Sequence, residues 1–199
     1  RLMAESMLEN IPDGGDIFLI QGPLTDNNVS LIREGIDETL AGSNLNVVYE
    51  ANCPGWIAEN AYTYTKEGLK LDRNVKGIIC GNDDLASQAF RALSEERLAG
   101  KVCVTGQDGD LAACQRIVEE TQEMTAFKSV EQEASLAAKC AVLLGLGEEI
   151  EEVQDTAYDG TYNVPYLELQ PIAVTKENMD EVIIKGGFHA KEDVYLNVN

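Results

Sequence analysis

The chain has 199 residues, of which 35 are acidic and 15 are basic, so its formal net charge at pH 7 is −20. A field of this sign repels a phosphate backbone, and we therefore expect no nucleic acid among the partners of the chain. Hydrophobic residues make up 44% of the sequence and charged residues 25%, an ordinary composition for a globular domain.

Short apolar runs alternate with helical patterns along the chain. Strands are expected at residues 16–22, 46–51, 76–80, 101–106 and 123–128. Helices are expected after them, at residues 25–42, 56–71, 85–98, 111–121 and 130–147. This alternation predicts βαβ crossovers and hence an α/β fold, a doubly wound parallel sheet with helices on both faces.

The last part of the chain has a different pattern. Residues 161–175 are expected to be extended, because Pro165 and Pro171 exclude a helix there, and a short helix should follow at 176–184. Ser129 with Gln132 forms a capping box that is expected to open the helix at 130–147. Helices are expected to stop at three glycines, Gly42, Gly100 and Gly147.

The sequence carries no recognisable signature of an enzyme, a metal site or a bound cofactor. It lacks the G-x-G-x-x-G, Walker and G-x-S-x-G motifs. Its five cysteines show no C-x-x-C spacing, and Cys80 and Cys103 stand in apolar runs where a thiol acts as a small hydrophobic group. The single histidine, His189, is interpreted as structural. We therefore expect neither catalysis nor a metal nor a cofactor.

Polar side chains recur at the carboxyl ends of the predicted strands, which is where open α/β sheets bind ligands. In strand order they are Asp26 and Asn28, Trp56, Asn82 and Asp83, Asp108, and Lys128. Carboxylates and amides can bond neighbouring sugar hydroxyls, and an indole ring can cover the apolar face of a sugar. The pattern predicts a cleft for a small polar molecule such as a sugar.

These residues also have structural interpretations. Asp26, either Asn82 or Asp83, and Gln107 with Asp108 could cap helices. Trp56 could belong to the core, and Lys128 could be a surface lysine. Paired carboxylates could in principle serve a glycosidase, although a site at strand ends suits simple binding at least as well. Within 81–84 we expect Asn82 to contact the sugar and Asp83 to cap the helix, with Asp84 in its negatively charged first turn.

Six stretches resemble, in order, the periplasmic sugar-binding proteins of ABC transporters with the type I fold: PLTDNNVSLIREG, GWIAENA, GNDDL, GKVCVTGQDGDLAACQRI, TQEMTAFKSV and VIIKGGFH. The resemblance covers nearly the whole length. It implies a Rossmann-like lobe that binds a monosaccharide, expected to be the pentose D-xylose, when two lobes close by hinge motion. The residues that match the sugar contacts of the family are Asp26, Asn28, Arg33, Trp56, Asn82, Asp108 and Lys128.

Family members have two lobes joined by three crossovers, and this sequence is expected to hold only the carboxyl-terminal lobe. By the same resemblance, residues 1–127 form that lobe, residues 128–156 cross into the absent amino-terminal lobe with a helix of their own, and residues 157–199 return. Residues 135–147 are apolar around most of a helix circumference. We therefore expect the missing lobe, or a second chain, to cover them.

The resemblance also implies an extracytoplasmic location and an ABC permease as partner. An alternative uses the same domain as a sugar sensor that docks on a membrane histidine kinase or chemoreceptor. A further alternative is the effector domain of a lactose-repressor-type transcription factor, which shares the fold. Residues 1–15 offer no basic helix-turn-helix for that role, and the net charge also disfavours it.

Overall fold

The computed structural model describes residues 1–151, 153 and 155–198, which form two compact units. The first unit consists of Arg1–Phe127 and Ala173–Asn199, and the second consists of Lys128–Ile172. The sequence predicts a return to the first unit at residue 157, whereas residues 157–172 group with the second unit. The reason is a hairpin, in which β6 (Asp155–Tyr158) pairs antiparallel with β7 (Asn163–Tyr166).

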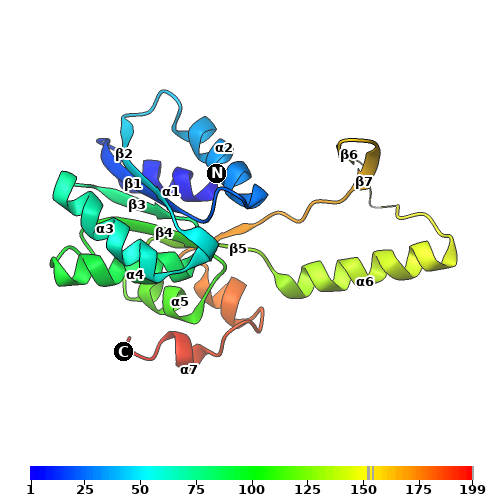
Figure 1. The fold of residues 1–199 in the computed structure, drawn as a ribbon. Helices are drawn as coiled ribbons and strands as arrows, with labels where there is room; N and C mark the ends of the chain where they lie inside the picture. Colours follow the sequence, from blue (N-terminus) through cyan, green and yellow to red (C-terminus); the bar gives the residue numbers. More distant parts are fainter. Residues whose placement is uncertain (152, 154, 199) are drawn as a thin grey trace. The chain divides into compact units, whose positions relative to one another are not determined.

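A six-stranded sheet has the strand order β2-β1-β3-β4-β5-β8 (Figure 1). The pairs β2–β1, β1–β3, β3–β4 and β4–β5 are parallel, which confirms the predicted α/β fold. Chain order reverses between β1 and β3, so the connections after these two strands leave toward opposite faces, and this is the point at which open α/β sheets have their ligand crevice. The strands are β1 (Gly15–Gln21), β2 (Leu45–Asn52), β3 (Gly77–Cys80), β4 (Cys103–Gln107), β5 (Met124–Phe127) and β8 (Ile172–Val174).

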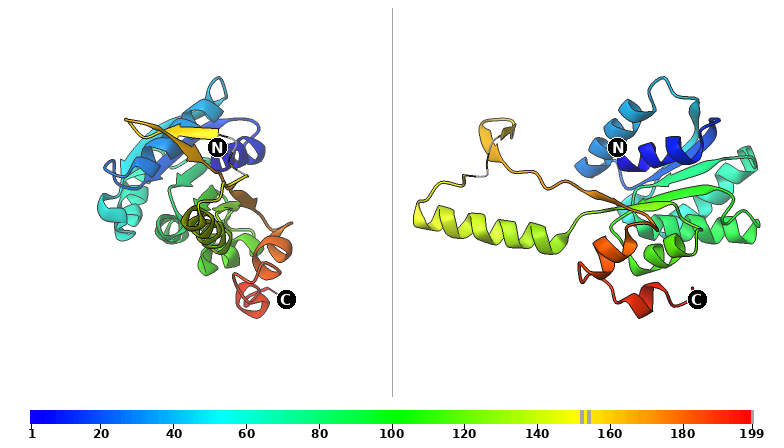
Figure 2. Two further views of the ribbon diagram at one scale, coloured as in Figure 1. Left: turned by 90° about the vertical axis from the view of Figure 1, so that its right-hand side faces the viewer. Right: turned by 180° about the vertical axis from the view of Figure 1, so that it is seen from behind.

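Helices cover both faces of this sheet (Figures 1 and 2). Strand β1 shows why, because alternate side chains of a strand point to opposite faces. Ile17 and Leu19 are buried with side chains of α1 (Leu2–Asn10) and α2 (Asn27–Leu40). Phe18 and Ile20 are buried with side chains of two other helices, α3 (Glu59–Leu71) and α4 (Asp83–Glu95).

The carboxyl-terminal segment completes the first unit beside β5. The helix expected at 176–184 is present as a short π-helix, Asp180–Ile184, and is followed by α7 (Lys191–Val194). These elements bury a third cluster with α5 (Leu111–Val118). Its fully or nearly fully buried members are Cys114, Ile117, Val118, Phe127, Val174, Met179, Ile183 and Val194.

The second unit contains α6 (Val130–Leu146) and the β6–β7 hairpin. The predicted capping box is confirmed in part, because Ser129 Oγ accepts a hydrogen bond from the Gln132 amide at 3.3 Å. The predicted stop is also confirmed, since Gly147 ends the helix in the left-handed conformation with φ of 75°. No residue of α6 is buried. In the described part of the chain, no helix has both the length and the hydropathy that crossing a membrane requires.

Candidate functional site

Asp26 and Trp56 form the best-defined contact at the carboxyl end of the sheet. Asp26 caps α2, and its Oδ1 accepts a hydrogen bond from the Asn28 amide at 2.9 Å. Its other oxygen, Oδ2, accepts from Trp56 Nε1 at 3.0 Å. Both bonds favour the ionised carboxylate and lower the pKa of Asp26. Asp26 therefore serves as a helix cap and also fixes the orientation of the indole ring.

The indole ring of Trp56 lies against the backbone at the ends of β1 and β3. A Cβ atom on Gly22, the residue after β1, would overlap the ring, and one on Gly81, the residue after β3, would lie 3.1 Å from Trp56 Cζ3. Trp56 itself has a φ of 57°, which is uncommon for a residue with a side chain. The ring is half-buried and packs against the core cluster on this face. It therefore borders the crevice where the strand order reverses.

Gln21, the last residue of β1, is a buried polar residue that the sequence reasoning missed. Its side chain is only 1% exposed, and neither its Oε1 nor its Nε2 has a hydrogen-bond partner among the described residues. A Cβ atom on Gly81 would lie 3.2 Å from Gln21 Oε1. The next strand supplies another amide, since Asn52 Nδ2 donates to the Gly22 carbonyl at 2.9 Å. A signal existed in the sequence, because Gln21 is the one polar residue that closes the apolar run 17–20.

Asn82, and not Asp83, caps α4. Asn82 Oδ1 accepts a hydrogen bond from the Leu85 amide at 2.9 Å, so the expected capping role of Asp83 is wrong. The cap uses only the oxygen of the Asn82 amide group, and the residue is half-buried at the end of β3. Asp84 is exposed in the first turn of α4, as the sequence predicts.

Asp83 is fully buried and accepts hydrogen bonds from two neighbouring segments. Its Oδ2 accepts from the Gly109 amide at 2.9 Å, the Asp110 amide at 3.1 Å and Thr125 Oγ1 at 2.7 Å. Its Oδ1 accepts from Gln122 Nε2 at 3.0 Å. Burial outweighs these bonds and raises the pKa of Asp83 to about 7. Asp83 therefore ties the start of α4 to the loop that follows β4.

Asp108 occupies that loop, between β4 and α5. Its φ of 106° lies in the left-handed region, and its amide donates to the Ala126 carbonyl at 3.0 Å. Asp110 occupies the N-cap position of α5, and the Asp110 side chain makes no capping hydrogen bond. The N-cap of α5 is therefore not Asp108. The side chain of Asp108 is half-buried beside the ends of β4 and β5.

Arg33 and Lys128 differ from the other predicted contacts. Arg33 Nε donates to Asp37 at 2.9 Å, and its guanidinium also pairs with Glu50, which raises the pKa of Arg33. Two carboxylates thus hold this side chain on α2. Lys128 directly follows β5, is exposed, and is the first residue of the second unit.

Of the predicted sugar contacts, the structure gathers Asp26, Trp56 and Asn82 around the ends of β1 and β3, with Asn28 exposed in the first turn of α2.

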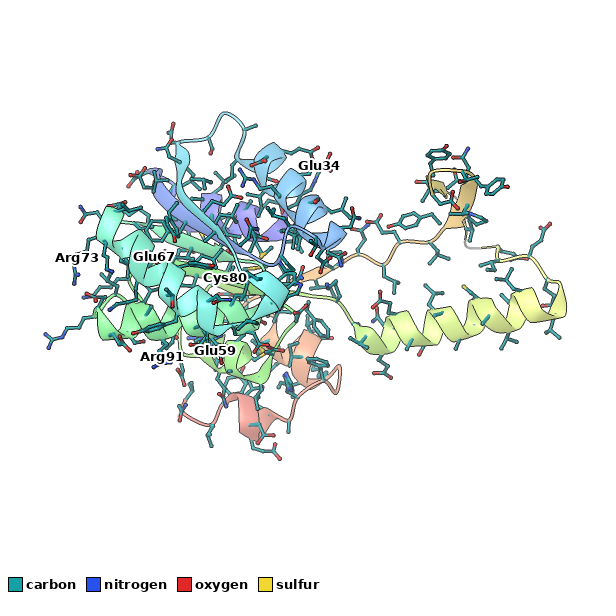
Figure 3. All side chains as sticks on the ribbon, in the orientation of Figure 1. Glu34, Glu59, Glu67, Arg73, Cys80 and Arg91 are labelled. Atoms are coloured by element: carbon teal, nitrogen blue, oxygen red, sulfur yellow. The ribbon has the colours of Figure 1, made fainter. Side chains whose placement is uncertain are left out.

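Cys80 and Cys103 are structural, as the sequence predicts. These two thiols are buried in the clusters on opposite faces of the sheet, and Figure 3 shows Cys80 in the interior near the end of β3. Burial raises the pKa of Cys53 to about 11 and that of Cys114 to about 12, so both thiols are protonated at neutral pH. Among the residues that the structure describes, no cluster of three or more His, Cys, Asp or Glu side chains is arranged to hold a metal ion.

Comparison with known proteins agrees with this geometry. A family model described as periplasmic binding protein domain matches residues 1–149. The chain is 40% identical to the D-xylose-binding periplasmic protein of Haemophilus influenzae and 36% identical to that of Escherichia coli. The alignments cover 98% and 97% of this chain and 59% of each relative. The chain thus spans about three fifths of the length of these relatives.

Solved structures give the same result for the fold. An ABC transporter periplasmic solute-binding protein from Actinobacillus succinogenes with bound D-allose superposes with a TM-score of 0.76 at 25% identity, covering 89% of this chain and 58% of that one. A solute-binding protein from Clostridium phytofermentans with bound β-D-glucose superposes with a TM-score of 0.81 at 22% identity, covering 97% and 67%. The chain therefore belongs to the family of periplasmic binding proteins with the type I fold.

Proposed function

We propose that this chain is the carboxyl-terminal lobe of the solute-binding component of an ABC sugar transporter, and that it binds a monosaccharide without catalysis. The observation that carries the proposal is the Trp56–Asp26 pair, which places an aromatic ring and a carboxylate at the crevice between β1 and β3. An apolar plate beside a charged acceptor suits a sugar ring, which has an apolar face and a rim of hydroxyls.

The sugar that we propose is D-xylose. The support comes from two relatives, at 40% and 36% identity, that are named D-xylose-binding proteins. In this proposal the indole of Trp56 covers the ring, and the remaining contacts are polar groups that bond its hydroxyls. Those groups are Asp26, Asn28, Asn82, Asp108 and Lys128. Arg33 joins them only if it exchanges Asp37 and Glu50 for the sugar.

We also propose that a second lobe closes over this site and packs against α6. Every residue of α6 is exposed or half-exposed, and Val142, Leu144 and Leu146 are each more than 60% exposed. Large apolar side chains exposed around a helix in this way indicate a surface that a partner covers. With only one lobe present, the sugar hydroxyls that face away from it stay hydrogen-bonded to water. The isolated chain should therefore bind sugar weakly.

The location and the membrane partner follow from the same proposal. Both D-xylose-binding relatives are named as periplasmic proteins, which supports a site outside the cytoplasm. The proposed partner is an ABC permease that recognises the closed form, since a sugar shifts the open–closed equilibrium by its preference for that form.

Calorimetric titration of the intact protein with a panel of monosaccharides tests this function. We expect D-xylose to bind with micromolar or tighter affinity, and hexoses and other pentoses to bind at least tenfold more weakly. No sugar should be chemically altered after prolonged incubation with the protein. Failure of every monosaccharide to bind would contradict the proposed function. If a sugar other than D-xylose binds most tightly, sugar binding stands and the proposed identity of the sugar is wrong.

A further inference from the structure

The buried carboxylate of Asp83 has no role in the proposed sugar contacts, because the side chain is wholly enclosed by protein. Space for it is made by Gly106 on β4, where a Cβ atom would overlap Asp83 Oδ1. A buried carboxylate is costly unless hydrogen bonds satisfy it, so its bonds indicate what it stabilises. All four donors come from the loop after β4 or from the segment around β5.

Gly109 is the centre of this arrangement. Its amide donates to Asp83 Oδ2 at 2.9 Å and also to Thr125 Oγ1 at 3.0 Å, and Thr125 in turn donates to Asp83. A second link passes through Gln122, which donates to Asp83 Oδ1 and accepts from Arg116 Nε at 2.9 Å. The start of α4 is therefore joined to the β4–α5 loop by a network that ends on the successive amides of Gly109 and Asp110.

The carbonyl of Gly109 is held from the opposite direction by the carboxyl-terminal segment. His189 Nε2 lies 2.8 Å from the Gly109 oxygen. Because a carbonyl oxygen can only accept a hydrogen bond, this nitrogen is the donor. The His189 ring packs on Phe188, which packs on Phe127, with ring centroids 4.5 and 4.8 Å apart. Phe127 also leaves no room for a side chain on Gly109, where a Cβ atom would lie 2.8 Å from Phe127 Cδ2.

We propose that Asp83 and His189 are positioning residues that hold the Gly109 peptide from both ends and thereby set the place of Asp108 in the sugar site. Asp108 has a φ of 106°, a conformation that costs free energy and persists only where neighbouring structure enforces it. Neither positioning residue touches the sugar, and both act through Gly109. The inference rests on the proposed function, because it assigns Asp108 to the sugar.

The first test compares Asp83→Asn with Asp84→Asn in the intact protein. An asparagine at 83 keeps a single acceptor oxygen and places an NH2 group against a donor that Asp83 now accepts from, whereas Asp84 is exposed and serves as a matched control. We expect Asp83→Asn to weaken D-xylose binding at least tenfold, shift the amide proton signals of Gly109 and Asp110 upfield, and speed their hydrogen exchange at least tenfold. Asp84→Asn should leave the sugar affinity and both signals unchanged.

The second test uses His189, whose replacement spares the buried network and keeps the proposal testable if Asp83→Asn does not fold. His189→Leu removes the donor to Gly109, and His189→Gln retains one. We expect His189→Leu to weaken D-xylose binding several-fold and His189→Gln to stay within about twofold of the wild type. Because thermal unfolding is recorded in parallel, a loss of affinity without a change in Tm identifies positioning rather than general damage.

The outcomes separate this inference from the function on which it rests. If the wild-type protein binds no monosaccharide, the proposed function fails, and the amide signals of Gly109 and Asp110 still decide whether Asp83 holds the loop. If the wild type binds D-xylose and the variants Asp83→Asn and His189→Leu bind it equally well, the positioning role is overturned and the proposed function stands.

Discussion

Trp56 is one residue with two environments, since it packs on the core and also borders the crevice between β1 and β3. We expect Trp56→Ala to weaken D-xylose binding in the intact protein by about tenfold to a hundredfold, because the sugar loses its aromatic plate. Trp56→Phe should lose less, as it keeps an aromatic face but not the bond to Asp26. Calorimetry measures both.

A neighbouring residue supplies the control for this prediction. Ile57 is 54% exposed, and Ile57→Ala should leave the affinity within about twofold of the wild type. Equal affinities for Trp56→Ala and the wild type would show that the indole ring is a core residue with no part in binding.

Asp83 predicts a pH dependence of stability. Its pKa is about 7 in the folded chain against an ordinary 3.8, so the folded chain keeps a proton that the unfolded chain has lost between those values. The resulting stabilisation is fully present below about pH 4 and is lost as pH rises through about 7. The free energy of unfolding of the wild type, relative to Asp83→Asn, should therefore fall by a few kcal/mol (order of magnitude) from pH 4 to 8.

Denaturant unfolding at a series of pH values measures this difference. Subtracting the variant removes the titrations that the two proteins share, including those of other carboxyls with raised pKa such as Asp110 and Glu123. A difference that stays constant from pH 4 to 8 would refute the assignment.

The residue scale is also where prediction from sequence was least complete. Asn82 and Asp83 are both favoured helix caps, and a shift of one residue in the helix start decides which of them enters the interior. The cap therefore falls on Asn82, one residue before the position expected from the sequence. Gln21 was overlooked because a single glutamine after an apolar run resembles any strand end. The burial of the Asp83 and Gln21 side chains depends on neighbouring strands that are distant in sequence.

At the scale of elements, the alternation of apolar runs and helical patterns predicted all five strands from β1 to β5 and the helices that follow them. Helix α1 was missed, although Met3 and Met7 stand one turn apart and are both buried against the sheet. The segment is short, and nothing in its sequence shows which face of which element it covers. The pairing of β6 with β7 was missed for the same reason, since each strand has only four residues.

The indole ring of Trp56 lies against Gly22, which follows β1, and Gly81, which follows β3. The ring fits there because neither residue has a side chain. We expect Gly22→Ala to push the ring outward, shift the fluorescence of the only tryptophan to longer wavelength, and lower Tm by several degrees. Gly145→Ala in α6 provides the control, because a Cβ atom there meets nothing within 4 Å. An unchanged emission spectrum for Gly22→Ala would contradict the described packing of Trp56.

As a whole molecule, the 199-residue chain is expected not to bind sugar tightly on its own. The exposed apolar side chains of α6 should drive association with a complementary lobe or with a second copy. Size-exclusion chromatography with light scattering should therefore show self-association of the isolated chain. Replacing Leu144 and Leu146 by Gln should reduce it, whereas Leu71→Gln, at a residue of comparable exposure in α3, should not.

A monodisperse monomer of the isolated chain at high concentration would contradict this prediction. The same sample tests the cleft, because a single wall should bind D-xylose with millimolar affinity or worse, and the addition of the complementary lobe should restore tight binding.

We propose that a monosaccharide binds at the crevice bordered by Trp56. Its most direct test is a D-xylose titration of the intact protein followed by the fluorescence of Trp56, the only tryptophan of this chain; where the intact protein has others, they are replaced by Phe. We expect a saturable emission change with a micromolar or tighter Kd that matches calorimetry. Binding by calorimetry with no change in the emission of Trp56 would contradict it.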